Sequence, residues 1–118
     1  MQPRVLVGTA EGLHDLSEKH RIPVAGHEVT SLAWGDSGWW AAIDGREVWR
    51  SGSDGEWTRI ATVEPLRANC LLQTGTELFV GTSEAHLFAL RGDALEPVPS
   101  FDKMRGREEW FTPWGGPP

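Results

Sequence analysis

Tyrosine is absent from the 118-residue sequence, cysteine occurs once, and there is no long hydrophobic run. A single cysteine, Cys70, cannot form an internal disulfide or a thiolate zinc site, which favours a reducing compartment. No apolar run approaches the ~18 residues of a membrane-spanning helix, and the N-terminal residues lack the apolar core of a signal peptide. We therefore predict a cytoplasmic protein without a membrane partner.

Positive charge is also scarce. Lys and Arg total 11 against 17 Asp and Glu, which gives a net charge of −6 at pH 7. The few basic residues form no cluster, and proteins bind nucleic-acid backbones through such clusters. The charge balance therefore predicts no nucleic-acid partner.

Helical periodicity is missing as well, because no window of about ten residues keeps apolar side chains at i, i+3 and i+4. What is present is a series of short β-like runs, separated by turns that draw on 14 glycines and 8 prolines. Residues 4–9, 29–34 and 77–82 are typical runs, and Asp44-Gly45 is a strong hairpin signal. Short strands spaced about 8–12 residues apart predict an all-β domain.

An internal repeat underlies these runs. A shift of 39 residues brings similar side chains together without a gap, and a shift of 73 residues aligns 7–12 with 80–85. The first shift superimposes Leu32 on Leu71, Trp40 on Phe79, Ala41 on Val80, Ala42 on Gly81, Val48 on Leu87 and Trp49 on Phe88. A unit of about 40 residues with four antiparallel strands, a to d, has the size of a β-propeller blade. The alternative is a three-sheet β-sandwich whose sheets are similar by chance.

The repeat divides the chain into parts of a propeller. These are an incomplete blade with strands b to d (4–25), a second blade (26–65), a third blade (66–98) and a long loop leading to a missing next strand (99–118). About 2.75 blades is fewer than the four of the smallest propellers. We expect an incomplete propeller, either a fragment of a longer protein or one that oligomerisation completes.

The repeat also predicts how side chains pack. Small residues in strand b, such as Gly8 and Gly81, suit sheets that crowd together near a central axis. The bulky strand-c residues Trp49 and Phe88 are expected to pack against the next blade. Cys70, in strand a of the third blade, is expected to be a small buried hydrophobic residue.

Two motifs in the second blade resemble those of known propeller families. Residues 48–57 resemble a degenerate Asp box, the hairpin motif of BNR-type, sialidase-like propellers. Ser51, Gly55 and Trp57 match this motif if Ser53 stands where the aspartate belongs and one residue is deleted before the tryptophan. The resemblance implies that these matching residues stabilise the hairpin, with glycine taking a positive φ and tryptophan covering the turn.

The second motif resembles a WD repeat, with Gly26-His27 before strand a, Asp44 in the b–c hairpin and Trp49 in strand c. The chain thus resembles the WD40/YVTN/BNR-like superfamily of repeat propellers, which includes glycosidase-like and photosystem-assembly-factor-like members. For His27, Asp44 and Trp49 the resemblance implies a structural hydrogen-bond relay.

Candidate binding residues lie in the loops that a propeller gathers at one end, the b–c and d–a loops. The residues expected to bind a ligand or partner there are Asp44, Arg46, Glu84, Arg105, Arg107, Trp110 and Trp114. Arginine and tryptophan side chains on the long segment 99–118 suit an anionic or ring-shaped ligand. In the alternative, Trp110, Phe111 and Trp114 fill the gap between two blades.

No spacing indicates catalysis, a metal or a cofactor. The four histidines, His14, His20, His27 and His86, lack the spacing of metal-ligating pairs, and no nucleotide-binding or nucleophile motif occurs. Sialidases use a tyrosine nucleophile, and this chain has none.

The favoured function is a non-enzymatic propeller segment that serves as an interaction scaffold for a protein or ligand. One alternative is a carbohydrate-binding or glycosidase-like BNR propeller whose active site lies mostly outside this chain, and another is a self-assembling homo-oligomer.

Overall fold

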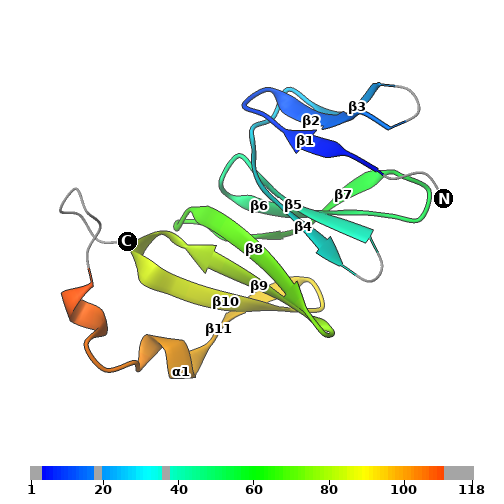
Figure 1. Ribbon diagram of the computed structural model, residues 1–118. Coiled ribbons are helices and arrows are strands. Elements are labelled where there is room, and N and C mark those ends of the chain that lie inside the picture. Colours follow the sequence, from blue (N-terminus) through cyan, green and yellow to red (C-terminus); the bar gives the residue numbers. More distant parts are fainter. Residues whose placement is uncertain (1–3, 18–19, 36–37, 111–118) are drawn as a thin grey trace.

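The computed structural model describes residues 4–17, 20–35 and 38–110, and within them eleven strands form three antiparallel sheets (Figure 1). The first sheet has the order β1-β2-β3 and contains β1 (Leu6–Gly8), β2 (Gly12–Asp15) and β3 (Arg21–Ala25). The second contains β4 (Val29–Gly35), β5 (Gly38–Ile43), β6 (Glu47–Ser51) and β7 (Trp57–Thr62). The third contains β8 (Ala68–Thr74), β9 (Glu77–Thr82), β10 (His86–Arg91) and β11 (Ala94–Pro97).

The second and third sheets have the same strand order, and strands that are neighbours in the sequence are neighbours in the sheet. Their register is also the same. Ala41 pairs with Trp49 in the second sheet, and Val80 pairs with Phe88 at the positions 39 residues further along. The all-β fold of four-stranded repeating units is therefore confirmed, and the similarity between the sheets is structural and not due to chance.

The core consists of two layers, one on each face of the second sheet. Successive side chains of a strand point to opposite faces, so β5 contributes to both layers. The layer against the first sheet contains Leu13, Val24, Val29, Ala41 and Ile43. The layer against the third sheet contains Trp40, Ala42, Val48, Val63, Ala68, Leu71, Leu78 and Val80. The second sheet is thus packed on both faces, whereas the first and third sheets each pack against one neighbour.

The sheets approach one another most closely at their first strands, where β1 contacts β4 and β4 contacts β8. A side chain at Gly8 would be too large here, because a Cβ atom would lie 2.6 Å from Cγ1 of Val29. The predicted crowding of the sheets at a small strand-b residue is therefore present at this position.

The direction in which the strand-c aromatics pack differs from the prediction. Trp49 packs in the layer against the first sheet, and Phe88 packs in the layer against the second. Both rings therefore contact the preceding sheet and not the next one. Register explains the result, because Trp49 pairs with Ala41 and shares its face, and that face meets the first sheet.

Cys70 is also placed differently from the prediction, since it is exposed and not buried. Its strand neighbour Leu71 takes the face that packs on the second sheet, which leaves Cys70 on the opposite face. No described part of the chain covers that face at Cys70, so the side chain remains accessible.

The segment after β11 contains short helical turns where a long loop was expected. A single-turn helix, α1 (Pro99–Asp102), lies against β10, and a 3₁₀ turn spans Arg107–Glu109. Proline suits the first position of a helix because its φ is already helical and no donor is needed there. The described part of the segment thus folds back beside the third sheet (Figure 1).

Candidate functional site

The predicted binding residues of the second sheet lie at the end where β5 turns into β6. Asp44 and Gly45 form the centre of this turn with φ values of 56° and 68°. Aspartate and glycine both tolerate this left-handed region, which two-residue hairpin turns favour. The turn brings the Asp44 carboxylate beside the connection between the first and second sheets.

Asp44 holds that connection through both carboxylate oxygens. Oδ2 lies 2.7 Å from Nδ1 of His27, and Oδ1 accepts a hydrogen bond of 2.9 Å from the backbone N–H of Glu28. The hydrogen bond with His27, followed by the one from Glu28, holds the pKa of Asp44 below its ordinary value. The side chain is therefore an ionised structural link between two sheets.

Trp49 takes part in this arrangement by ring contact only. Its ring centroid lies 5.7 Å from that of His27, but its indole N–H donates to Oε1 of Glu47 at 2.9 Å. That bond, together with Arg59, lowers the pKa of Glu47. The structure thus brings the three residues of the WD-like motif together but hydrogen-bonds only His27 and Asp44 to each other.

The Asp-box-like hairpin is stabilised differently from what the motif implies. Oγ of Ser51 accepts a 2.9 Å hydrogen bond from the backbone N–H of Trp39, in the neighbouring strand. Within the turn the acceptor is Asp54, whose Oδ1 receives the N–H of Glu56 at 2.9 Å, while Gly55 has a φ of 84°. Trp57 packs in the layer between the first and second sheets.

The two arginines at this end, Arg46 and Arg67, form exposed ion pairs. Arg46 lies 3.2 Å from Glu64, and Arg67 lies 3.1 Å from Glu28 while its side chain covers the Gly45 turn. Exposed pairs of this kind stabilise a fold little, by about 0–1 kcal/mol each. Arg46 therefore has an acidic partner within the chain.

The predicted residues after the third sheet are also held within the chain. Nη2 of Arg107 donates to the backbone carbonyls of Glu84 and Ala85 and lies 3.2 Å from Nδ1 of His86. Glu84 and Ala85 both have a positive φ, so this guanidinium caps an unusual turn between β9 and β10. Arg107 thereby ties the C-terminal segment to the third sheet.

The remaining predicted residues are not part of this cluster. Trp110 packs on Phe101, with ring centroids 5.7 Å apart, so the two rings join the ends of the segment after β11. Arg105 is exposed. Trp114 lies outside the described residues.

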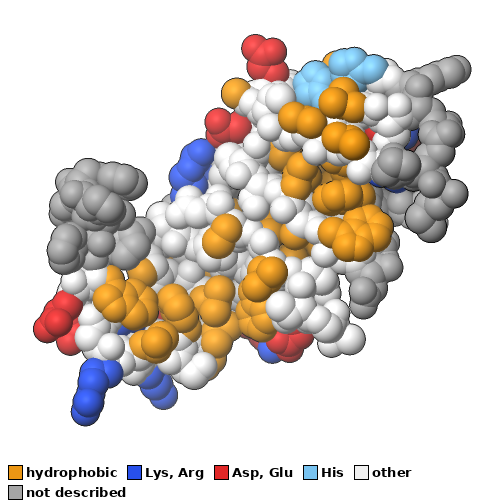
Figure 2. Space-filling view, in the orientation of Figure 1, with side chains coloured by type: hydrophobic (Ala, Val, Ile, Leu, Met, Phe, Trp, Pro, Cys, Tyr) orange, Lys and Arg blue, Asp and Glu red, His pale blue; other side chains and the backbone are white. Residues whose placement is uncertain are grey.

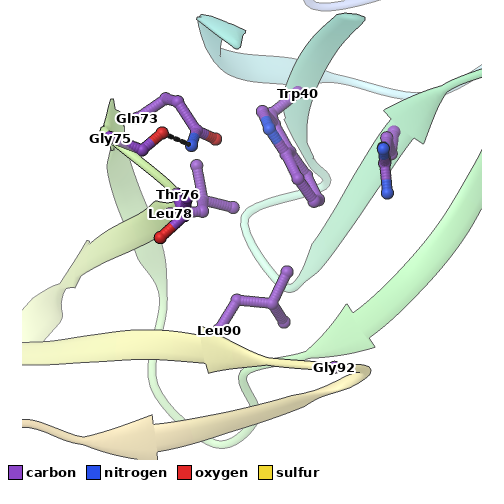
Figure 3. Close-up of a pocket in the computed structure, with 8 residues that line it drawn as sticks. Trp40, Gln73, Gly75, Thr76, Leu78, Leu90 and Gly92 are labelled. Carbon is purple, nitrogen blue, oxygen red and sulfur yellow. Dashed lines mark hydrogen bonds between the residues drawn. The ribbon is translucent and has the colours of Figure 1, made fainter. Parts of the chain in front are cut away.

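A hollow that the sequence did not predict lies at the opposite end, between the second and third sheets. Its volume is about 340 Å³, and its lining comes from Trp40, Arg50, Gln73, Gly75, Thr76, Leu78, Leu90 and Gly92. Figure 3 shows the Trp40 indole facing Thr76 and Gln73 across the hollow, with Leu90 between the two sides. Pockets of about 300–1,000 Å³ with apolar walls and a few polar groups are typical ligand sites.

The walls of this hollow combine apolar and polar groups. The Arg50 guanidinium lies over the Trp40 ring, 5.3 Å from its centroid. On the other side, Nε2 of Gln73 donates to the carbonyl oxygen of Gly75 at 3.0 Å, which orients its amide at the rim. Trp40 and Arg50 are paired across β5 and β6. That cross-strand pairing is the signal from which the sequence could have indicated the site.

No group of three or more His, Cys, Asp or Glu side chains in the described ranges could hold a metal ion. None of the described helices is long and apolar enough to cross a membrane.

Comparison with known proteins rests on the fold. No family model and no curated protein sequence matches the chain. A solved structure described as YCF48 bound to D1 peptide matches with a TM-score of 0.61 over 80% of this chain, at 10% sequence identity. The chain is a partial β-propeller. It spans 36% of the YCF48 chain, and the likeness agrees with the propeller fold that the internal repeat predicts.

Proposed function

We propose that this partial propeller is a non-enzymatic scaffold that binds a protein partner by holding an extended peptide segment of it. The observation that carries the proposal is the hollow between the second and third sheets. Leu90, which is only partly buried, provides apolar surface for a side chain of the peptide, and the Gln73 amide stands at the rim. This combination suits an amphipathic peptide, because the apolar groups contribute affinity and the polar rim selects orientation.

A protein of the same fold provides a precedent. The YCF48 structure that matches this chain is described as bound to a D1 peptide. The likeness at 10% identity concerns the fold, so we transfer only the general mode, a peptide held by a propeller.

The state of the carboxylates supports a role without catalysis. The pKa values of Asp15, Asp44 and Glu47 all lie below their ordinary values, because hydrogen bonds from within the chain stabilise the charged forms. A general acid needs the opposite, a pKa raised toward the working pH. These three groups are therefore suited to holding the sheets together.

A display library of random 12-residue peptides, panned on the immobilised chain, tests the proposal. We expect selected peptides to bind the wild-type chain and to lose about tenfold or more in affinity for Thr76→Trp, because the indole fills the mouth of the hollow. Thr62→Trp is the matched control, since Thr62 is exposed at the far end of β7. It should leave the affinity unchanged.

Two results would overturn the proposal. One is a library that yields no binder, and the other is a selected peptide that binds Thr76→Trp as tightly as the wild type. A glycan array run beside the library separates the carbohydrate-binding alternative, which predicts sugar binding in place of peptide binding.

A further inference from the structure

The third sheet presents an apolar face with no described neighbour. A hollow of about 300 Å³ on this face is lined by Cys70, Leu72, Thr74, Phe79, Gly81 and Leu87. The Leu72 side chain is 59% exposed, and Figure 2 shows hydrophobic side chains gathered over this sheet. An apolar sheet face of this kind is a feature of interaction surfaces.

The internal repeat shows what this face is built to hold. Phe79, Gly81 and Leu87 are the equivalents, 39 residues later, of Trp40, Ala42 and Val48. In the second sheet those three residues are buried against the third sheet. The open face of the third sheet therefore has the pattern by which one blade holds the next.

A hydrogen bond at the existing junction extends the comparison. Ser31 of the second sheet accepts the backbone N–H of Leu71 at 3.2 Å, across to the third sheet. Cys70 is its equivalent on the open face, so it stands where a neighbouring blade would come closest.

The outer face of the first sheet has the opposite, complementary pattern. Val5 and Val7, at 50% and 39% exposure, correspond to Leu78 and Val80 at the 73-residue shift. Leu78 and Val80 are buried against the preceding blade. His14 pairs with Val7 as Phe88 pairs with Val80. The first sheet thus carries the surface that packs onto a blade before it.

We propose that two copies of this chain close a head-to-tail ring, in which the first sheet of each copy packs on the third sheet of the other. Each new junction repeats the contacts that Leu78, Val80 and Phe88 make with the second sheet, whereas the first sheet has no counterpart of β8. Two copies provide six sheets, within the usual range of about four to eight blades in a propeller. An interface between different surfaces of the two copies gives a closed assembly when the rotation closes, as a ring requires.

Light scattering of the purified 118-residue chain measures the mass of the assembly in solution, which shows whether two copies associate. We expect a mass of twice 13.0 kDa for the wild type and 13.0 kDa for Leu72→Glu and for Val7→Glu, because each variant places a charge in both junctions of the ring. Trp34→Glu is the matched control. Trp34 is 62% exposed, but it belongs to β4 of the second sheet and not to the outer face of the first or third sheet. This variant should remain a dimer.

Mixing the two variants tests the head-to-tail arrangement. A Leu72→Glu copy keeps an intact first sheet, and a Val7→Glu copy keeps an intact third sheet, so an equimolar mixture should form pairs through one unaltered junction. Circular dichroism confirms that each variant is folded. If Leu72→Glu fails to fold, Thr74→Arg alters the same face from an exposed position.

Four outcomes would overturn the ring. A monomeric wild type shows that no second copy covers the face, and a mass above two copies shows that the junctions do not close. A Val7→Glu variant that stays dimeric while Leu72→Glu is monomeric indicates that the third sheets meet each other. A mixture that remains monomeric likewise excludes the complementary junction.

Discussion

Asp15 illustrates at the residue scale how this small fold accommodates a buried charge. The residue is 3% exposed, and its carboxylate receives the backbone N–H of Ser17 at 3.0 Å and the Arg4 guanidinium at 2.8 Å. The hydrogen bond from the Ser17 backbone is the main reason that its pKa lies far below the ordinary value, and Arg4 adds to it. The charged form is therefore the one that stabilises the first sheet.

We expect Asp15→Asn to lower the free energy of unfolding by about 1–3 kcal/mol at pH 7, since the charge-assisted bonds are lost. Because the folded pKa is depressed, the stabilisation is present above the unfolded pKa of about 4 and decreases as the pH falls below it. Urea unfolding at pH 7 and pH 3 should thus show a difference from the wild type that narrows in acid.

Asp93→Asn serves as the control for this pair of measurements, because Asp93 is exposed in the turn between β10 and β11. It should change stability little at either pH. An equal loss for Asp15→Asn at both pH values would show that packing, and not charge, explains the effect.

At the scale of the strand, the burial of a side chain depends on whether another sheet covers the face to which it points. Val48 on β6 is fully buried between the second and third sheets, whereas its repeat equivalent Leu87 on β10 lies half-buried on the open face. The two positions have the same place in their blades and different surroundings. The difference comes from the neighbouring sheet alone.

This pair of positions gives a prediction for the element. At protein concentrations at which the chain is a monomer, Val48→Ala should lower the free energy of unfolding by about 1–3 kcal/mol, because it leaves a cavity in a packed layer. Leu87→Ala removes more atoms but should cost less, since the open face is already in contact with water. Urea unfolding of both variants measures the comparison, and a larger cost for Leu87→Ala would show that the open face is covered.

The whole molecule is elongated, because its three sheets are stacked in a row that does not close into a ring. Its Cα radius of gyration is 15.3 Å, against about 13.5 Å for a compact domain of this length, and its extents are 48 × 31 × 24 Å. A closed propeller would bring the outer sheets into contact with each other. The extended shape is the consequence of three blades without that closure.

Small-angle X-ray scattering tests this shape on the Leu72→Glu variant, which is expected to be monomeric. We predict a radius of gyration near the 15.3 Å of the single chain, with an elongated distance distribution. A value near the compact figure of about 13.5 Å would contradict the open arrangement. Trp34→Glu, measured in the same way, should instead show the larger particle of two copies.

The sequence by itself determined the strands, their turns and the repeat. Alternating side chains and turn residues such as Asp44-Gly45 act over a few positions, so they can be recognised without a partner. The pairing of Ala41 with Trp49 and of Val80 with Phe88 follows from the same 39-residue spacing. The contact of His27 with Asp44 could also be inferred, because it belongs to a motif.

Only the tertiary structure decided which neighbour each face meets. It turned Trp49 toward the preceding sheet, left Cys70 exposed, used Arg107 to cap a turn and formed the hollow beside Trp40. These outcomes depend on how whole sheets stack, and residues distant in sequence determine that stacking. The physical reason is that alternation assigns a side chain to a face but contains no information about what lies beyond it.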